Sequence, residues 1–255
     1  MEFIDTHSHL YDEAFFGEED LAMQRSFEAG VTKLIFPDID SKSRDAMFSF
    51  ADRYKENIFP CLGLHPTSID ADWEKEMIEM ERHLDRRIWA IGEIGIDCYW
   101  SKEFLEQQKE AFRIQLETAA KKSLPVIIHS RESTELIINI LKENQHLGCR
   151  GVFHAYSGSI ETYRQLQKLG DWYIGIGGVL TYKKASIAET IKDIPLERII
   201  LETDSPYLTP VPFRGKRNES SYIPFIAQKL ADITGKELGE IAHTTTDNAK
   251  KLFNL

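Results

Sequence analysis

Residues 124–131 read Leu-Pro-Val-Ile-Ile-His-Ser-Arg, an apolar run that ends in polar residues, the first of them a histidine. Apolar side chains at helical spacing predict a long helix near 102–122 before this run, and a second helix is predicted near 132–143 after it. A continuous apolar run between two helices is typical of a parallel strand that is buried on both faces. The stretch therefore predicts one strand–helix unit of an α/β fold.

The same unit recurs along the whole chain. The predicted strands lie near 3–5, 32–36, 58–62, 88–91, 125–128, 151–153, 172–175 and 198–201. The predicted helices lie near 19–29, 42–54, 72–86, 102–122, 132–143, 160–169, 184–193, 219–234 and 236–252. Eight such units in 255 residues favour a closed (β/α)8 barrel, typically of about 250 residues, over an open sheet. We predict that residues 1–255 form one α/β domain, a TIM-like barrel.

The composition limits the classes of protein to which the chain could belong. A net charge of -10 disfavours a protein that coats duplex nucleic acid, because such binding depends on phosphate neutralisation. No apolar run is long enough to span a bilayer, and the N-terminus lacks the features of a signal peptide. The three cysteines are widely spaced, which disfavours a disulfide framework. We expect a cytoplasmic protein with no membrane partner and no obligate protein partner.

Polar side chains gather where the predicted strands end, and barrels of this kind place their active sites there. Five of the eight histidines follow predicted strands, namely His7, His9, His65, His129 and His154. Two acidic residues, Glu93 and Asp204, hold equivalent positions. Histidines scattered over a surface would rarely fall on one rim, so this placement favours a metal site over ordinary polar strand ends.

Several of these residues also have simpler explanations. His65 precedes a proline, and a contact to substrate or to another ligand suits it better than metal binding. Glu93 lies between two glycines after a buried strand, where a carboxylate is costly unless a metal or a donor satisfies it, so a ligand role is favoured. Asp97 could cap the helix that follows. Glu202 should alternate away from the neighbours of Asp204, and we rank it below Asp204 as a ligand.

The number and type of candidate ligands indicate how many ions they hold. Four imidazoles and two carboxylates are too many for one tetrahedral zinc ion. They suit two divalent ions bridged by a carboxylate and a hydroxide, an arrangement that serves hydrolysis of phosphate esters and amides. Magnesium, manganese and zinc are all compatible with mixed nitrogen and oxygen ligands. No G-x-S-x-G motif offers a competing nucleophile.

Segments spread in order over essentially the whole chain resemble the TatD-related deoxyribonucleases, a branch of the amidohydrolase superfamily. They are FIDTHSHL, GLHP, GEIGIDCYW, LPVIIHSR, HAYSGS, ILETDSPYLTPVPFRGKRNES and TTTDNAKKLF. The His-x-His pair is shared with many amidohydrolases, whereas Glu93 and the ETDSPYL and RGKRN segments are more specific to this branch. The resemblance implies a TIM-like barrel that hydrolyses DNA with divalent metal ions, often from the 3′ end.

The resemblance also implies a role for each matching residue. One ion would be held by His7, His9, Glu93 and Asp204, and a second by Glu93, His129 and His154. Asp204 would in addition accept a proton from the attacking water, so Glu93 and Asp204 are the predicted catalytic residues. His65 and Arg131 would lie near the scissile phosphate.

Three segments depart from the family pattern without touching a predicted ligand. Phe213 stands where the family often has histidine, and Thr67 stands where a charged residue or histidine is usual. Ala155 and Tyr156 replace a common Cys-Phe pair. The first two departures bear on substrate preference rather than on hydrolysis.

The basic residues near the predicted barrel mouth suggest how DNA would be held. Arg214, Lys216 and Arg217 lie in a proline-rich loop near 203–218 beside Asp204, and we expect them to contact phosphate. Lys183 and Lys184 read better as solvated loop charges. The aromatic residues that could stack on bases are Trp100, Tyr207 and Phe213. An acidic body with a basic mouth suits an enzyme that acts on the ends of short single strands.

Two other functions are compatible with parts of the sequence. An amidohydrolase-type deacylase or amide and ester hydrolase, for example one acting on aminoacyl-tRNA, would keep the metal ions and change the bond that is cleaved. A barrel that only binds ligands is disfavoured by the complete set of metal-binding side chains.

Overall fold

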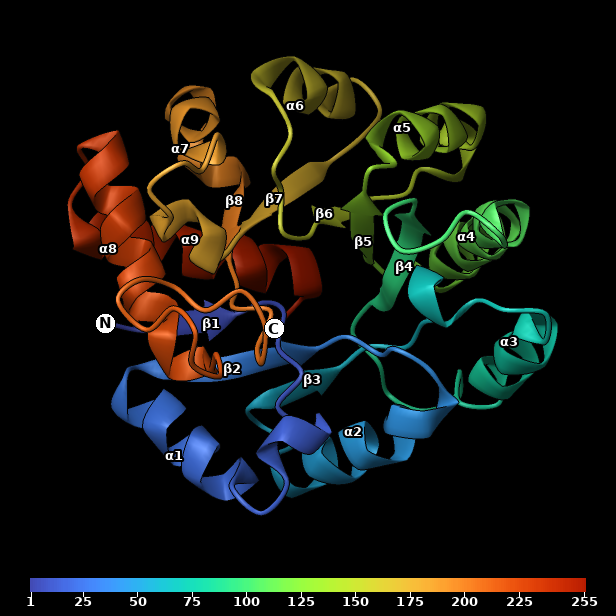
Figure 1. Cartoon of the computed structure of the whole chain (residues 1–255), viewed down its shortest axis with the longest axis horizontal. Helices are drawn as coiled ribbons and strands as arrows, with labels where there is room; N and C mark the ends of the chain where they lie inside the picture. The colour runs from blue at the N-terminus through green and yellow to red at the C-terminus, as the bar shows by residue number, and fades with distance from the viewer.

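The strands form a ring inside a layer of helices in the computed structural model, which describes residues 1–255 (Figure 1). The strands are β1 (Phe3–Asp5), β2 (Val31–Phe36), β3 (Ile58–Pro60), β4 (Ile91–Asp97), β5 (Val126–Arg131), β6 (Gly151–Phe153), β7 (Trp172–Ile176) and β8 (Ile199–Leu201). They pair in parallel as β1-β2-β3 and as β4-β5-β6-β7-β8. Isolated parallel bridges, Ser8 with Ser205 and Leu62 with Ile91, join the two ladders. The predicted TIM-like α/β barrel is confirmed.

Nine α-helices follow from the same alternation. They are α1 (Glu19–Glu28), α2 (Ser41–Arg53), α3 (Trp73–Glu81), α4 (Leu105–Lys122), α5 (Thr134–Glu143), α6 (Ile160–Gln167), α7 (Ile187–Thr190), α8 (Ile223–Thr234) and α9 (Leu238–Phe253). Helices α1 to α8 surround the ring, whereas α9 passes behind it (Figure 1). None of these helices is both long enough and apolar enough to cross a membrane.

The helix boundaries have local causes. The Asp40 carboxylate accepts the Lys42 N–H at the start of α2, and the Ser159 hydroxyl accepts the Thr162 N–H at the start of α6. Helix α8 ends at Gly235, whose φ of 69° is the left-handed conformation that glycine adopts at little cost. These short-range signals set where α2 and α6 begin and where α8 ends.

Side chains of each strand alternate between two apolar layers. In β5, Val126 and Ile128 face the surrounding helices, while Ile127 faces the inside of the ring. The inner layer comprises Ile4, Ile35, Phe59, Cys61, Ala90, Ile127, Val152, Tyr173 and Ile200, together with Ala249, Leu252 and Phe253 of α9. Helix α9 therefore closes the amino-terminal end of the barrel, and only the carboxyl-terminal end can hold a polar site.

Strand β4 differs from the prediction. The sequence predicts a strand near 88–91, but β4 runs from Ile91 to Asp97, so Glu93 lies within the strand rather than after it. Gly95 pairs with His129 of β5 at a φ of 145°, and a Cβ there would collide with the His129 carbonyl oxygen. The glycines that seemed to end the strand instead let it approach β5 closely.

Smaller differences occur near the C-terminal third. Helix α7 is shorter than the predicted 184–193 and continues as the 3₁₀ turn Ile191–Asp193. Helix α8 starts at Ile223 rather than near 219, after the 3₁₀ turn Ser220–Tyr222. The segment near 203–218 has neither helix nor strand, as predicted.

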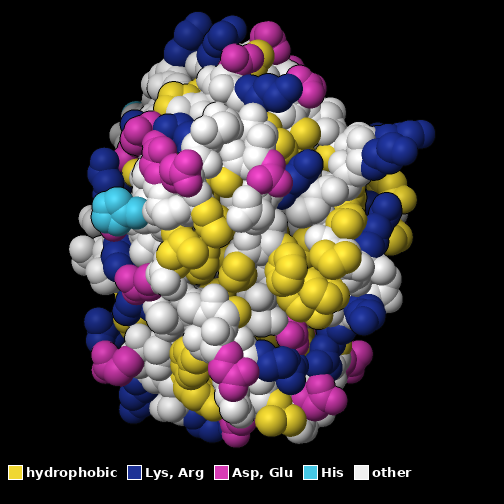
Figure 2. Space-filling model, turned by 90° about the vertical axis from the view of Figure 1, so that its left-hand side faces the viewer, with side chains coloured by type: hydrophobic (Ala, Val, Ile, Leu, Met, Phe, Trp, Pro, Cys, Tyr) yellow, Lys and Arg dark blue, Asp and Glu magenta, His cyan; other side chains and the backbone are white.

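The face that carries α1 and α8 exposes hydrophobic side chains among charged ones (Figure 2). Leu21 and Phe27 of α1 and Phe225 of α8 are among the exposed hydrophobic side chains of these two helices. Phe213, predicted to stack on bases, lies flat on Tyr222 at 4.3 Å between ring centroids and meets Phe225 edge-on at 5.0 Å. One face of the Phe213 ring is therefore already covered by the protein itself.

Candidate metal centre

Strand alternation aims three polar side chains into the open end of the barrel. His129, His154 and Glu202 each follow an inward-facing residue by two positions, namely Ile127, Val152 and Ile200. Residues i and i+2 of a strand face the same side, so these three side chains face the interior as well. The sequence already shows that Glu202 follows the apolar Ile200 by two positions, which indicates an inward-facing side chain. The prediction that ranked Glu202 below Asp204 as a ligand did not use this spacing.

Glu93 lies at the centre of the cluster and is almost fully buried. Its Oε2 atom lies 3.1 Å from Nε2 of His7 and 4.0 Å from Nε2 of His9. Its Oε1 atom lies 2.9 Å from Nδ1 of His129 and 3.8 Å from Nε2 of His154. Oε1 also lies 3.5 Å from Nε2 of His65, so the two oxygens of this carboxylate face different groups of imidazoles.

Asp204 approaches the same imidazoles from the other side. Its Oδ1 atom is 3.6 Å from Nε2 of both His7 and His9, and its Oδ2 atom is 3.9 Å from Nε2 of His154. The Asp204 backbone N–H donates to the His7 carbonyl oxygen at 2.8 Å, so the turns after β1 and β8 hold one another. This hydrogen bond between adjacent turns helps to fix the position of Asp204.

The donor set fits divalent cations. Nε2 of His7 and Nε2 of His9 point at one another across 3.1 Å, with the Glu93 and Asp204 carboxylates within 4.0 Å. Three groups of side chains bring their possible ligand atoms within 4.8 Å of one another: His7, His9 and Asp204; His7, His154 and Glu202; and His65, Glu93 and His129. Buried nitrogen and oxygen electron pairs that converge in this way are expensive without a cation between them.

The ionisation states of the central groups match that use. Burial acts to raise the pKa of Glu93, but the neighbouring imidazoles of His7, His65 and His154 hold that pKa well below its usual value. Burial lowers the pKa of His7, which leaves its imidazole neutral with a free electron pair. An ionised Glu93 and a neutral His7 are the states in which these two side chains bind metal, whereas His129 and His154, whose pKa values are raised, would each release a proton on binding a cation.

Two carboxylates outside the predicted set orient the outer histidines. Glu202 Oε1 lies 3.0 Å from Nδ1 of His154, and Asp97 Oδ2 lies 3.0 Å from Nε2 of His129. Burial lowers the pKa of His154, but the charges of Glu202, Glu93 and Asp204 together outweigh burial and raise the pKa to about 10. Burial also lowers the pKa of His129, but its hydrogen bonds with Asp97 and Glu93 together raise the pKa to about 9. Such carboxylate–histidine pairs set ring orientation around metal ions.

Asp97 has a second task that agrees with the prediction. Its Oδ1 atom accepts the backbone N–H groups of Tyr99 and Trp100, at 2.9 and 3.1 Å, and so caps the turn that leads to α4. One carboxylate therefore fixes both the turn and the His129 ring, and the sequence indicated only the first of these roles.

His65 joins the cluster in a way that disfavours metal binding. Its Nε2 atom lies 3.5 Å from Glu93 Oε1, and its Nδ1 atom accepts the Thr67 backbone N–H at 3.1 Å. Burial lowers the pKa of His65, so the ring is neutral and its single proton lies on Nε2. A protonated nitrogen donates a hydrogen bond rather than coordinating a cation.

The predicted substrate-binding arginines divide into two groups. The Arg131 guanidinium lies 3.8 Å from the centroid of Tyr99, and that of Arg214 lies 4.3 Å from the centroid of Tyr182. Arg217 instead donates to the Ala14 carbonyl oxygen and to Glu18, both at 2.6 Å. These donors tie the proline-rich loop to the segment before α1, and a contact of Arg217 with substrate stays a prediction.

Comparison with known proteins agrees with this geometry. The sequence profile described as TatD related DNase matches residues 4–254. An uncharacterized metal-dependent hydrolase of Bacillus subtilis, YabD, is 36% identical over 258 residues, covering 98% of both chains. YjjV of Escherichia coli, also described as an uncharacterized metal-dependent hydrolase, is 32% identical over 257 residues, covering 99% of this chain and 98% of YjjV.

Solved structures extend the comparison to the fold. The crystal structure of YjjV matches with a TM-score of 0.90 at 30% identity, covering 99% of this chain and 98% of that chain. A TatD family hydrolase from Entamoeba histolytica matches with a TM-score of 0.82 at 26% identity, covering 99% of this chain and 98% of that one. With its barrel, its converging histidines and carboxylates and these relatives, the chain belongs to the TatD-related DNase family of metal-dependent hydrolases.

Proposed function

We propose that the protein cleaves phosphodiester bonds of DNA, acting from the 3′ end of single strands with two divalent cations. The observation that carries this proposal is the placement of Glu93, whose two oxygens face different groups of imidazoles. A single-ion site has no need for a buried carboxylate shared in this way, whereas two-ion hydrolases of phosphate esters are built around one.

The cations would be Mg²⁺, Mn²⁺ or Zn²⁺, held by two sets of ligands that share Glu93. One set is His7, His9, Glu93 and Asp204, and the other is Glu93, His129 and His154. When bound, such cations polarise phosphate and lower the pKa of water to about 7 in favourable cases. Glu202 and Asp97 keep the outer imidazoles in a fixed orientation.

Asp204 is the general base of this mechanism. Its side chain is 16% exposed, against 3% for Glu93, so Asp204 is the carboxylate that can reach water at the mouth. The nearby imidazoles hold the pKa of Asp204 below its usual value despite burial, so the carboxylate is ionised before it accepts a proton. Its position between the turns after β1 and β8 limits its movement during that step.

His65 and Arg131 contact the scissile phosphate. The His65 proton on Nε2 is available as a donor, because Nδ1 is engaged by Thr67. Arg131 is exposed, its guanidinium lies 3.8 Å from the Tyr99 centroid, and it forms no ion pair with a carboxylate. Trp100 and Tyr207 are 69% and 58% exposed beside the site and offer ring faces to unpaired bases, which favours single strands over duplex.

Digestion of labelled single strands tests the proposal. Oligonucleotides labelled at either end are incubated with Mg²⁺, Mn²⁺ or Zn²⁺, and in parallel with EDTA, and an aminoacyl-tRNA is offered under the same conditions. We expect stepwise loss from the 3′ end that requires metal. Glu93→Gln should abolish it, while Glu117→Gln on the outer face of α4 should not. Equal digestion in EDTA, or faster release of the amino acid than of nucleotides, would refute the assignment.

A further inference from the structure

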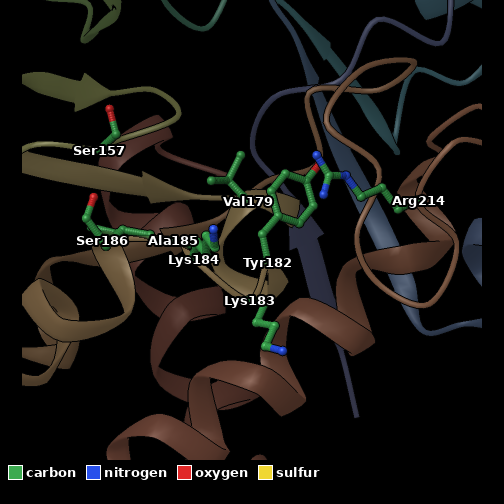
Figure 3. Close-up of a pocket in the computed structure, with 9 residues that line it drawn as sticks. Ser157, Val179, Tyr182, Lys183, Lys184, Ala185, Ser186 and Arg214 are labelled. Atoms are coloured by element: carbon green, nitrogen blue, oxygen red, sulfur yellow. The ribbon is translucent and has the colours of Figure 1, made fainter.

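A pocket of about 560 Å³ opens beside the metal centre, between the loops that follow β6, β7 and β8 (Figure 3). The residues that line it are Ser157, Val179, Tyr182, Lys183, Lys184, Ala185, Ser186, Ile187 and Arg214. In the close-up, Arg214 reaches from the loop after β8 toward the ring of Tyr182, whose own loop follows β7. The volume lies within the range of pockets that hold small organic ligands.

Hydrogen bonds hold the two main walls of this pocket together. The Tyr182 hydroxyl donates to the Thr209 carbonyl oxygen at 3.0 Å. The Val211 backbone N–H donates to the Thr181 hydroxyl at 2.8 Å, which is a second link between the same loops. With Arg214 stacked 4.3 Å from the Tyr182 centroid, the guanidinium is held in place before any ligand arrives. The pocket is therefore a preformed site rather than a gap between mobile loops.

The charges of the pocket are unbalanced. Lys183, Lys184 and Arg214 line it, and no acidic residue does. None of these three cations forms an ion pair elsewhere in the protein, unlike Arg217, which pairs with Glu18. In a chain with a net charge of -10, three unpaired cations in one hollow make a local site for an anion.

The pocket lies next to the metal centre. A smaller cavity shares Val179 and Ile187 of its lining and is also lined by Glu202 and Asp204. These shared residues place an anion held by Arg214 to one side of the reacting centre. A polymer with one phosphate at the metal centre would place a neighbouring unit here.

We propose that this pocket is a binding subsite for the nucleotide adjacent to the scissile bond. Its phosphate contacts Arg214 and the lysine pair, and its sugar and base lie against Val179, Ala185 and the Tyr182 ring. The inference rests on the proposed nuclease function and narrows it, because it makes the preferred substrate a strand with a second phosphate. The lysines expected to be solvated loop charges thereby acquire a binding role.

Equilibrium binding of strands that resist cleavage tests the subsite independently of catalysis. Thymidine 5′-monophosphate (pT) and phosphorothioate-linked pTpT and pTpTpT are titrated calorimetrically into the protein at low and moderate salt with Mn²⁺ present, so that the first phosphate can bind at the metal centre. The variants are Arg214→Ala, the double variant Lys183→Ala/Lys184→Ala, and the control Arg82→Ala. Arg82 is an exposed arginine just after α3, at the opposite end of the barrel, because the helices run antiparallel to the strands.

For the wild type and Arg82→Ala, we expect pTpT to bind roughly fivefold to tenfold more tightly than pT. Arg214→Ala and the double lysine variant should lose most of this gain in affinity from pT to pTpT, while their affinity for pT stays at the wild-type value. For pTpT, the slope of log affinity against log salt should fall by about 0.7 when one phosphate contact is removed. Arg214→Lys, which keeps the positive charge, should recover part of the gain in affinity from pT to pTpT.

Other outcomes would overturn the subsite. One is that the wild type binds none of the ligands, and another is that Arg214→Ala still binds pTpT more tightly than pT to the same extent as the wild type. A third is that Arg214→Ala weakens the binding of pT and pTpT equally, which would place Arg214 at the scissile phosphate. Displacement of pTpT by a glutamate peptide of equal charge would mean that the pocket takes acidic peptides instead. Digestion of DNA with Mn²⁺ separates the two proposals. If the protein binds pTpT more tightly than pT but cleaves no DNA, the nuclease function is refuted and the subsite remains.

Discussion

Gly175 provides the space in which Glu202 orients His154, so Gly175→Ala should disturb the metal centre without changing any ligand. Gly175 lies in β7, and a Cβ at this position would collide with the Glu202 carboxylate. That carboxylate accepts the Ala155 N–H at 2.6 Å and lies 3.0 Å from Nδ1 of His154. The added methyl group must therefore push the carboxylate away from both partners.

The size of the effect follows from the contacts that are lost. Overpacking a buried position costs about 1–3 kcal/mol, and a hydrogen bond to a charged group contributes roughly 1.5–3 kcal/mol. Because the two effects arise from the same displacement, we expect a combined loss of about 2–4 kcal/mol in the free energy of unfolding. Loss of a carboxylate that orients a ligating histidine typically costs about 10–100-fold in metal affinity.

Two measurements check this prediction. Urea denaturation gives the change in unfolding free energy, and titration of Mn²⁺ or Zn²⁺ followed by calorimetry gives the metal affinity. Gly239→Ala is a matched control, because Gly239 lies in α9 with no neighbouring atom near the added Cβ, and it should be neutral or slightly stabilising. Wild-type metal affinity in Gly175→Ala would refute the role assigned to Glu202.

Three further predictions concern the outer contacts of the site and the ions. Asp97→Asn should lower metal affinity about 10–100-fold by releasing the His129 ring, measurable by the same titration, and an unchanged affinity would show that the ring is held otherwise. Arg217→Ala should lower the Tm while leaving the KM for DNA unchanged, since it pairs with Glu18, and a raised KM would support its predicted substrate role. Adding metal at 100 times its Kd to EDTA-treated protein should raise the unfolding free energy by about 2.7 kcal/mol, seen as a higher Tm in calorimetry, whereas a metal-independent Tm would count against any ion at this site.

Much of the fold could be predicted because its signals are local. Runs such as Val126–Ile128 are apolar on both faces, and this requires a sheet covered on both sides. Helix caps and left-handed glycines act within a few residues. Strand β4 was predicted too short because its glycines are explained only by the neighbouring strand, which no local pattern describes.

The candidate ligands were also largely visible in the sequence, since each one lies in or after the carboxyl-terminal part of a predicted strand. Which atoms face one another was not visible. His154 and Glu202 are 48 positions apart in the chain, and His129 and Asp97 are 32 positions apart, so each pair joins different strands. The same holds for Arg217, whose partner Glu18 lies 199 positions away.

The sequence by itself determined that this chain is a parallel barrel with imidazoles and carboxylates at one rim, because periodicity and strand ends are properties of short segments. Only the tertiary structure decided that Glu93 lies between two groups of histidines. The same holds for Arg217, which ties the proline-rich loop to the segment before α1, and for Arg214, which lines a separate pocket. These outcomes depend on the register between strands and on how loops from distant segments pack together. Neighbours of that kind are set by closure of the ring, and no short segment contains the information that specifies them.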